Sequence, residues 1–196
     1  LAEIDAFLPP VDPPNIFALG KNYADHAAEF DGSVPDEPVI FLKATTSVTA
    51  HRQPIVLPQG FPDEVDYEAE LAVVIGRTAK HVSRANAADC VLGVTCANDV
   101  TQRKCQKELD GQWARAKSFD TFCPLGPALV TGLDLSDLQV RLRLNGDVMQ
   151  EASTRDLLWD VPATIELLSS CCTLRPGTVI LTGTPAGVGG ARTPPV

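Results

Sequence analysis

Proline interrupts this chain at 16 of its 196 positions, and this feature most restricts what the chain can fold into. Because proline lacks an amide hydrogen and clashes with the preceding helical turn, long helices are excluded wherever it recurs. The run Leu-Pro-Pro-Val-Asp-Pro-Pro at residues 8–14 predicts an extended, proline-rich N-terminal segment over residues 1–15. Short apolar runs bounded by proline, glycine or aspartate follow it, and such runs are typical of β-strands.

These apolar runs predict many short strands and few helices. The strands are expected at residues 16–20, 38–42, 54–57, 67–75, 90–97, 138–144, 147–149 and 177–182. Asn145-Gly146 lies between two of them, suits a type I′ turn and predicts a hairpin. Helices are expected over residues 22–30, where Asn22 is a good N-cap, and over residues 161–170. This balance favours an α+β, mainly β domain over alternating βαβ units.

Charge and apolar content exclude several classes of protein. Asp and Glu number 25 against 16 Lys and Arg, so the net charge is −9 and no basic stripe is available to bind nucleic acid. No apolar run approaches the roughly 20 residues that a membrane-spanning helix needs. The six cysteines form no pair of Cys-x-x-Cys motifs, which argues against structural zinc. We expect reduced thiols in a cytoplasmic protein, or in a mitochondrial one if the source is eukaryotic.

Two carboxylates stand close together in the strand expected at residues 67–75. In an extended strand Glu68 and Glu70 point to one face, while Tyr67, Ala69 and Leu71 point to the other. Two anions this close raise each other's pKa unless a cation lies between them. A divalent cation that prefers oxygen ligands, such as Mg²⁺, Mn²⁺ or Ca²⁺, would neutralise the repulsion between the two carboxylates. Spacing alone also allows an exposed strand with two solvated glutamates.

Asp99 ends the next apolar run and would be a third carboxylate beside Glu68 and Glu70. Three carboxylates on one divalent ion leave coordination positions free for substrate and water. Taken alone, an aspartate at such a position is a common turn former.

Other polar residues fall at spacings that allow catalysis or binding. His26 and Glu29 lie three residues apart on an expected helix, where the carboxylate can make the imidazole a general base for water. Arg103 and Gln106 follow Asp99 by four and seven residues, so on a helix they would share a face and clamp a carboxylate. Each of these residues also fits an ordinary solvent-facing position.

The glycine-rich run at residues 183–190 suggests nucleotide binding, but the details do not fit. The run lacks the Gly-Lys-Ser/Thr ending of a P-loop and does not open a helix as the dinucleotide motif does. A turn that presents backbone N–H groups and the Thr184 hydroxyl to an anion stays open. Lys117, flanked by aromatic residues, can stabilise an enolate or carboxylate near a metal.

In these residues the sequence resembles the fumarylacetoacetate hydrolase family, from about Ile16 onward. The matching stretches occur in the family's order and spacing: residues 20–26 (GKNYADH), 38–43 (PVIFLK), 66–71 (DYEAEL), 97–100 (ANDV), 117–120 (KSFD) and 181–185 (LTGTP). The resemblance implies a catalytic domain over residues 16–196, built as a mixed β-roll of β-clip type with few short helices. Because relatives usually continue past the last residues here, it also implies that a C-terminal strand is missing.

The same resemblance implies roles for individual residues. It implies one divalent ion per chain, Mg²⁺ or Mn²⁺, on the ligands Glu68, Glu70 and Asp99. Positions that hold substrate or stabilise charge are matched by Arg103, Gln106, Lys117 and Thr184. His26 and Glu29 match a dyad that relatives carry on a lid. The family also implies a homodimer and a small-molecule 2-oxo or 2,4-dioxo acid substrate, with neither nucleic acid nor a membrane as partner.

We therefore expect a metal-dependent hydrolase that cleaves a carbon–carbon bond in acylpyruvates or related 2,4-dioxo acids. Within the family, oxaloacetate decarboxylation and isomerisation of 2-hydroxyhepta-2,4-diene-1,7-dioate stay open as alternatives. Outside enzymes, a catalytically inactive metal-binding assembly module is the alternative. An intact His26–Glu29 dyad together with Lys117 favours an enzyme.

Overall fold

The computed structural model describes residues 6–30 and 34–195, and its largest element is a mixed seven-stranded sheet. The strand order is β2-β1-β11-β5-β6-β8-β3. The strands are β1 (Ile16–Gly20), β2 (Val39–Lys43), β3 (Val48–Ala50), β5 (Ala69–Ile75), β6 (Val91–Asn98), β8 (Cys123–Leu125) and β11 (Val179–Leu181). Pairing is parallel between β1 and β11 and between β3 and β8, and antiparallel between the other neighbours.

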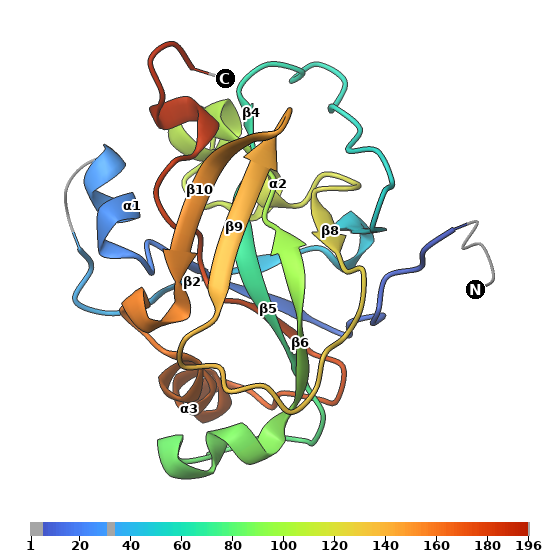
Figure 1. Ribbon diagram of the computed structural model, residues 1–196, viewed down its shortest axis with the longest axis vertical. Helices are drawn as coiled ribbons and strands as arrows, with labels where there is room; N and C mark the ends of the chain where they lie inside the picture. Colours follow the sequence, from blue (N-terminus) through green and yellow to red (C-terminus); the bar gives the residue numbers. More distant parts are fainter. Residues whose placement is uncertain (1–5, 31–33, 196) are drawn as a thin grey trace.

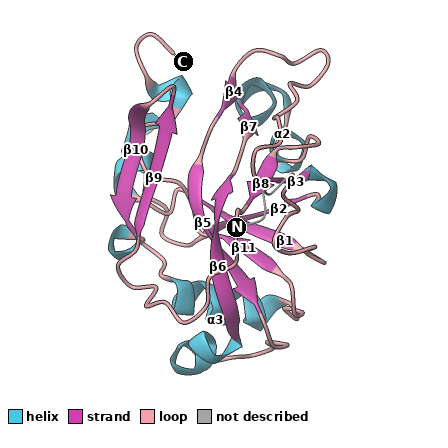
Figure 2. Ribbon diagram, turned by 45° about the vertical axis from the view of Figure 1, so that its right-hand side comes forward, coloured by secondary structure: helices cyan, strands magenta, loops and turns pink. Residues whose placement is uncertain are grey.

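The sheet curls because its two edge strands are joined directly. β2 and β3 lie at opposite ends of the strand order, yet they are consecutive in the chain and linked by the short 3₁₀ turn Thr45–Ser47. So short a connection requires the two edges to approach each other, and the sheet closes into a half-barrel (Figure 2). The prediction of an α+β, mainly β fold with a mixed sheet and few short helices is therefore confirmed.

Smaller elements surround this sheet. The hairpin of β9 (Gln139–Leu144) and β10 (Asp147–Ser153) lies in front of β5 and β6, and α3 (Val161–Cys171) lies at the lower end of the molecule (Figure 1). The remaining pieces are the strand pair β4 (Val65–Asp66) and β7 (Thr101–Gln102), the helices α1 (Ala24–Phe30) and α2 (Ala114–Lys117), the π-helix Cys105–Leu109, and the 3₁₀ helices Arg84–Cys90, Thr154–Asp156 and Gly189–Ala191. Residues 6–15 form neither helix nor strand.

Both faces of β5 are buried. Val73 and Ile75 belong to a core shared with Ile165 of α3 and Val140 of β9. Val74, on the other face, belongs to a second core formed with β1, β8 and β11. Each fully buried aliphatic side chain stabilises the fold by about 1.5–3 kcal/mol, so the strand that carries Glu70 is held rigidly.

Several local predictions are confirmed. Asn145 (φ 53°) and Gly146 (φ 95°) both adopt the left-handed conformation that a type I′ hairpin turn requires. The helix expected at residues 161–170 is α3, and the side chain of Asp160 accepts a hydrogen bond of 2.9 Å from the N–H of Ala163.

Two local predictions are wrong and a third holds only in part. Residues 54–57 form a loop instead of a strand, because Pro54 offers no N–H and the N–H of Val56 donates to the Thr121 hydroxyl (2.8 Å). The strand expected at 67–75 is confirmed over residues 69–75 as β5, but residues 67 and 68 lie in a break after β4, which ends at residue 66. Asn22 is not bonded to its own helix, because its side chain donates to the backbone oxygens of Thr182 (2.7 Å) and Trp159 (3.0 Å).

No helix in the described ranges has the length and apolar character that crossing a membrane would require.

Candidate active site and metal centre

The three predicted acidic ligands converge in the interior. Glu70 lies near the start of β5, opposite Ala97 of β6, and Asp99 directly follows β6. Glu68 precedes β5, and all three side chains are buried. One carboxylate oxygen from each residue lies within 4.8 Å of the oxygens offered by the other two. The alternative of two solvated glutamates on an exposed strand is thereby excluded.

The break between β4 and β5 is what turns Glu68 inward. The N–H of Glu68 donates to the side-chain oxygen of Asn98 (2.8 Å), and its carbonyl accepts from the N–H of Asp99 (2.8 Å). The Thr101 hydroxyl donates to Glu68 Oε1 at 3.0 Å. These bonds replace regular ladder pairing at the break and place the carboxylate against Asp99.

Three cations surround the carboxylates. Lys117 Nζ lies 2.7 Å from Glu68 Oε2 and 2.6 Å from Asp99 Oδ2, and Lys43 Nζ lies 2.5 Å from Asp99 Oδ1. Arg103 Nη2 lies 2.8 Å from Glu68 Oε1. All three cationic side chains are buried, which proteins accept only when such charges are paired.

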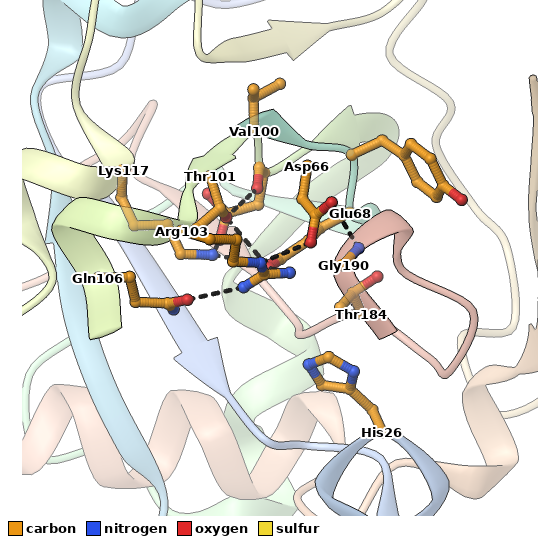
Figure 3. A network of polar contacts seen from close by, with 12 residues as sticks. His26, Asp66, Glu68, Val100, Thr101, Arg103, Gln106, Lys117, Thr184 and Gly190 are labelled. Atoms are coloured by element: carbon orange, nitrogen blue, oxygen red, sulfur yellow. Dashed lines mark hydrogen bonds and ion pairs between the residues drawn. The ribbon is translucent and has the colours of Figure 1, made fainter. Parts of the chain in front are cut away.

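Arg103 links the acidic cluster to the predicted substrate residue Gln106. Its Nε donates to Asp66 Oδ2 (2.6 Å) and its Nη1 to Gln106 Oε1 (2.7 Å). Figure 3 shows Arg103 between Asp66 and Gln106, with the imidazole of His26 facing the group from below. Arg103 and Gln106 lie in one helical stretch and are bonded to each other, as their spacing predicts, whereas Asp99 lies outside this stretch because β7 intervenes.

Neighbouring charges move the pKa values of Glu68 and Glu70 in opposite directions. Burial alone would raise the pKa of Glu68, but the positive charges of Lys117 and Arg103 bring it down to about 2. Burial and the negative charges of Asp99 and Glu68 raise the pKa of Glu70 well above its usual value. Burial would lower the pKa of Lys117, but the charges of Asp99 and Glu68 raise it. Glu70 is therefore the ligand that the surrounding cations compensate least.

This donor set fits one hard divalent cation. The ligands are oxygens only, they are buried, and they converge from two segments onto one point. Such oxygen-only sets suit Mg²⁺, Mn²⁺ or Ca²⁺ and not zinc. The buried group contains four carboxylates, Asp66, Glu68, Glu70 and Asp99, and three cations, Lys43, Arg103 and Lys117. When all are ionised the group carries one net negative charge, and a divalent ion would leave it one positive charge for an anionic substrate.

The predicted dyad is formed. His26 Nδ1 lies 2.9 Å from Glu29 Oε2, and the N–H of Gly187 donates to Glu29 Oε1 at 2.7 Å. Because an ionised carboxylate can only accept, His26 Nδ1 carries the hydrogen and Nε2 is left as the basic nitrogen. His26 is buried on the inner side of α1, whereas Ala24 and Asp25 on the same helix are exposed.

One cavity of about 200 Å³ brings most of the predicted site residues together. Its lining includes His26, Glu68, Arg103, Gln106, Lys117 and Thr184. The wall also contains Trp113, which supplies an apolar surface. A larger cavity of about 640 Å³ lies beside the start of α3, and its lining contains none of the predicted site residues. The smaller cavity is therefore the candidate active site.

Thr184 is fixed by β5 and β10. Its hydroxyl donates to the carbonyl of Ala69 (3.0 Å) and accepts from Gln150 Nε2 (2.8 Å). Next to it, the N–H of Gly183 donates to Glu70 Oε2 at 2.6 Å. The glycine-rich run thus does present its N–H groups to an anion, and the anion is a carboxylate of the same chain.

Sequence reasoning missed Lys43, Asp66 and Gln150. Lys43 follows Phe41 at the next inward position of β2, and a lysine on a buried strand face requires an acidic partner; this signal was available in the sequence. Asp66 lies within the stretch DYEAEL that was already singled out. Nothing local indicates Gln150, because its buried position depends on how the β9–β10 hairpin packs.

Comparisons with known proteins show which family the chain resembles. A family model described as fumarylacetoacetate (FAA) hydrolase C-terminal matches residues 15–196. An uncharacterized protein from Archaeoglobus fulgidus is 52% identical over 183 residues, which cover 93% of this chain and 72% of that protein. The mitochondrial oxaloacetate tautomerase fahd2 of Xenopus laevis is 45% identical over 199 residues, covering 100% of this chain and 62% of that protein.

A solved structure is also similar to this chain. The crystal structure of 5-carboxymethyl-2-hydroxymuconate delta-isomerase from Mycobacterium smegmatis superposes with a TM-score of 0.86 at 51% identity. The match covers 93% of this chain and 72% of that one. The resemblance found in the sequence is therefore confirmed over almost the whole chain.

Proposed function

The chain belongs to the fumarylacetoacetate hydrolase family, and on that premise we propose that it is a divalent-metal-dependent hydrolase of acylpyruvates or related 2,4-dioxo acids. The observation that carries the proposal is the shared cavity: His26 of the His26–Glu29 dyad lines the same cavity as Glu68, one of the three clustered carboxylates. Named relatives include a tautomerase and an isomerase, and also the fumarylacetoacetate hydrolase of Exiguobacterium antarcticum.

The chain's own residues can carry out each proton transfer in the reaction. A divalent ion on Glu68, Glu70 and Asp99 would act as a Lewis acid on the adjacent oxo and carboxylate oxygens of the substrate. Arg103 and Gln106 line the cavity and would orient the substrate carboxylate, since guanidinium groups bind carboxylates in a forked geometry.

His26 Nε2 would take a proton from water, and the resulting hydroxide would attack the distal carbonyl carbon. The carbon–carbon bond then breaks with its electron pair passing to the pyruvyl fragment, which leaves as an enolate, while the other fragment leaves as a carboxylic acid. Lys117 would stabilise the developing negative charge, and the imidazolium would return its proton to the enolate carbon to give pyruvate. The net change is addition of one water across the broken bond.

A second candidate is keto–enol tautomerisation or double-bond isomerisation of a 2-oxo dicarboxylate. It is favoured by the similarity to the tautomerase and the isomerase named above. This reaction needs the same Lewis acid and a base that moves a proton between carbon and oxygen, but it needs no attacking water.

A substrate panel separates the candidates. We would incubate the protein with Mg²⁺ or Mn²⁺ and acetylpyruvate, fumarylpyruvate or oxaloacetate, and identify the products by mass spectrometry and NMR. Acetate plus pyruvate from acetylpyruvate supports the hydrolase, and pyruvate plus carbon dioxide from oxaloacetate supports a decarboxylase. Faster interconversion of enol and keto oxaloacetate alone supports the tautomerase. Absence of any turnover supports the inactive metal-binding module.

We also propose a homodimer, in line with the family. Light scattering coupled to size-exclusion chromatography measures it directly, and a monomer across the micromolar range would contradict it.

A further inference from the structure

The glycine-rich loop donates three backbone N–H groups to three carboxylates of the chain itself. Gly183 donates to Glu70 (2.6 Å), Gly187 to Glu29 (2.7 Å) and Gly190 to Asp66 (2.8 Å). One of these acids is a candidate metal ligand, one belongs to the dyad and one anchors Arg103. Of the three, only the Gly187 bond connects the loop to α1.

The carbonyl of Gly187, which belongs to the peptide group after the one that carries its N–H, is held by two side chains. The Tyr67 hydroxyl donates to the Gly187 carbonyl at 3.0 Å, and Arg192 Nε donates to the same oxygen at 3.3 Å. Arg192 Nη2 also donates to the carbonyl of Met149 (2.7 Å), at the β-bulge of β10. The loop passes so close to this bulge that a Cβ on Gly187 (φ 106°) would lie 2.0 Å from Met149 O. Only glycine fits there.

We propose that Gly187, held through both its N–H and its carbonyl, is a latch that orients the His26–Glu29 dyad, and that Tyr67 and Arg192 are its positioning residues. Glu29 accepts one hydrogen bond from Gly187 and one from His26, so the direction of the first bond sets the direction of the second. The N–H and the carbonyl of Gly187 belong to two consecutive peptide groups that share its Cα, and together these contacts fix its backbone dihedral angles. Loss of either contact to the carbonyl frees these angles, so that the N–H moves relative to Glu29 and the basic nitrogen of His26 turns away from the cavity. The catalytic consequence rests on the proposed function, whereas the docking of α1 does not.

The simpler explanation is that Tyr67 and Arg192 only stabilise their own loop. The two explanations differ at α1, which touches neither side chain through any hydrogen bond in the described contacts and reaches them only through Gly187. A purely structural role would lower the melting temperature and leave the opening of α1 relative to the core unchanged.

The test uses hydrogen exchange and kinetics on the full chain. We would compare Tyr67→Phe and Arg192→Met with Arg143→Met, which removes a similar bond from an exposed arginine to a glycine carbonyl in the β9–β10 turn. We expect amides of α1 to exchange about fivefold faster in the first two variants, the ratio that loss of one hydrogen bond gives, and amides of α3 to keep their rates. Mn²⁺ affinity should stay within about twofold, and kcat should fall about fivefold at constant KM.

Rescue completes the test. Arg192→Lys keeps a cationic donor near both carbonyls and should recover most of the protection of α1 and most of kcat. Unchanged exchange in α1, or faster exchange without a loss of kcat, would overturn the latch. If the wild-type protein turns over none of the oxo acids, the proposed function fails, yet the exchange experiment still decides whether Gly187 holds α1.

Discussion

Glu68 and Glu70 lie only two residues apart, yet their surroundings shift their pKa values in opposite directions. Glu68 faces Lys117 and Arg103, so it stays ionised in the interior, whereas Glu70 faces mainly Asp99 and Glu68 and favours its protonated form. The lowered pKa of Glu68 stabilises the fold above pH 4.5, and this stabilisation is lost as the pH falls through about 2. The pKa of Glu70 is shifted in the opposite direction. The contribution of Glu70 to the stability of the fold is therefore present below pH 4.5 and is lost as the pH rises through its raised pKa.

Glu70→Gln tests this assignment in metal-free protein. Glutamine resembles the protonated acid and cannot ionise, so the stability of the variant relative to wild type should increase as the pH is raised from about 5 to about 8 in EDTA. The measurement is the melting temperature of both proteins across that range. Saturating Mn²⁺ should reverse the order, because only the wild type offers a third carboxylate. A constant difference at all pH values would contradict the raised pKa.

His26→Ala separates water activation from metal binding. Removing a general base costs typically 10²–10⁴-fold in rate, so we expect kcat for acylpyruvate cleavage to fall by about that factor. Mn²⁺ binding, measured by titration calorimetry, should be preserved because His26 is not among the ligands. Cleavage at the wild-type rate would show that the dyad has another role. Tautomerase activity that survives in this variant would favour the second candidate function.

At the scale of elements, strand periodicity predicted the direction of Glu70, whereas long-range pairing placed residues that no local pattern indicates. Alternation along β5 correctly placed Glu70 opposite its apolar neighbours, because each β-strand fixes the direction of its own side chains. The position of Arg103 could not be obtained in this way. It depends on β7 pairing with β4, through Val65 with Gln102 and Asp66 with Thr101, and no local pattern encodes that contact.

The same reason explains the wrong helix cap. Asn22 before an Ala-rich stretch is locally a good N-cap, but its buried side chain instead joins the end of β1 to the end of β11 and to Trp159. Three hydrogen bonds to distant segments outweigh the single bond that a cap would make.

Asn22→Ala is therefore expected to destabilise the whole fold. It leaves the backbone oxygens of Thr182 and Trp159 and the N–H of Trp159 without this partner in the interior. We expect a loss of about 3 kcal/mol in the free energy of unfolding, measured by urea denaturation. Asn86→Ala, at an exposed position, is the control and should change the free energy by less than about 0.5 kcal/mol. Similar values for both variants would show that the side-chain bonds of Asn22 contribute little.

At the scale of the whole molecule, the half-barrel gathers charges that the sequence keeps far apart. The acids come from residues 66–99 and their cationic partners from residues 43–117, so the cluster exists only in the folded chain. Ligands that come together only on folding make metal binding and folding the same equilibrium. Metal should therefore stabilise this protein as well as activate it.

Addition of Mn²⁺ at about one hundred times its Kd should raise the free energy of unfolding by about 2.7 kcal/mol. For a chain of 196 residues this corresponds to a rise in melting temperature of roughly 5–10 °C, measurable by differential scanning fluorimetry. Glu68→Gln and Asp99→Asn should abolish the rise because each removes a charged ligand, whereas Glu108→Gln, at an exposed position, should retain it. EDTA should remove both the rise and the activity, and Mn²⁺ should restore them. Turnover that persists after EDTA treatment and dialysis would show that the carboxylate cluster is not a metal centre.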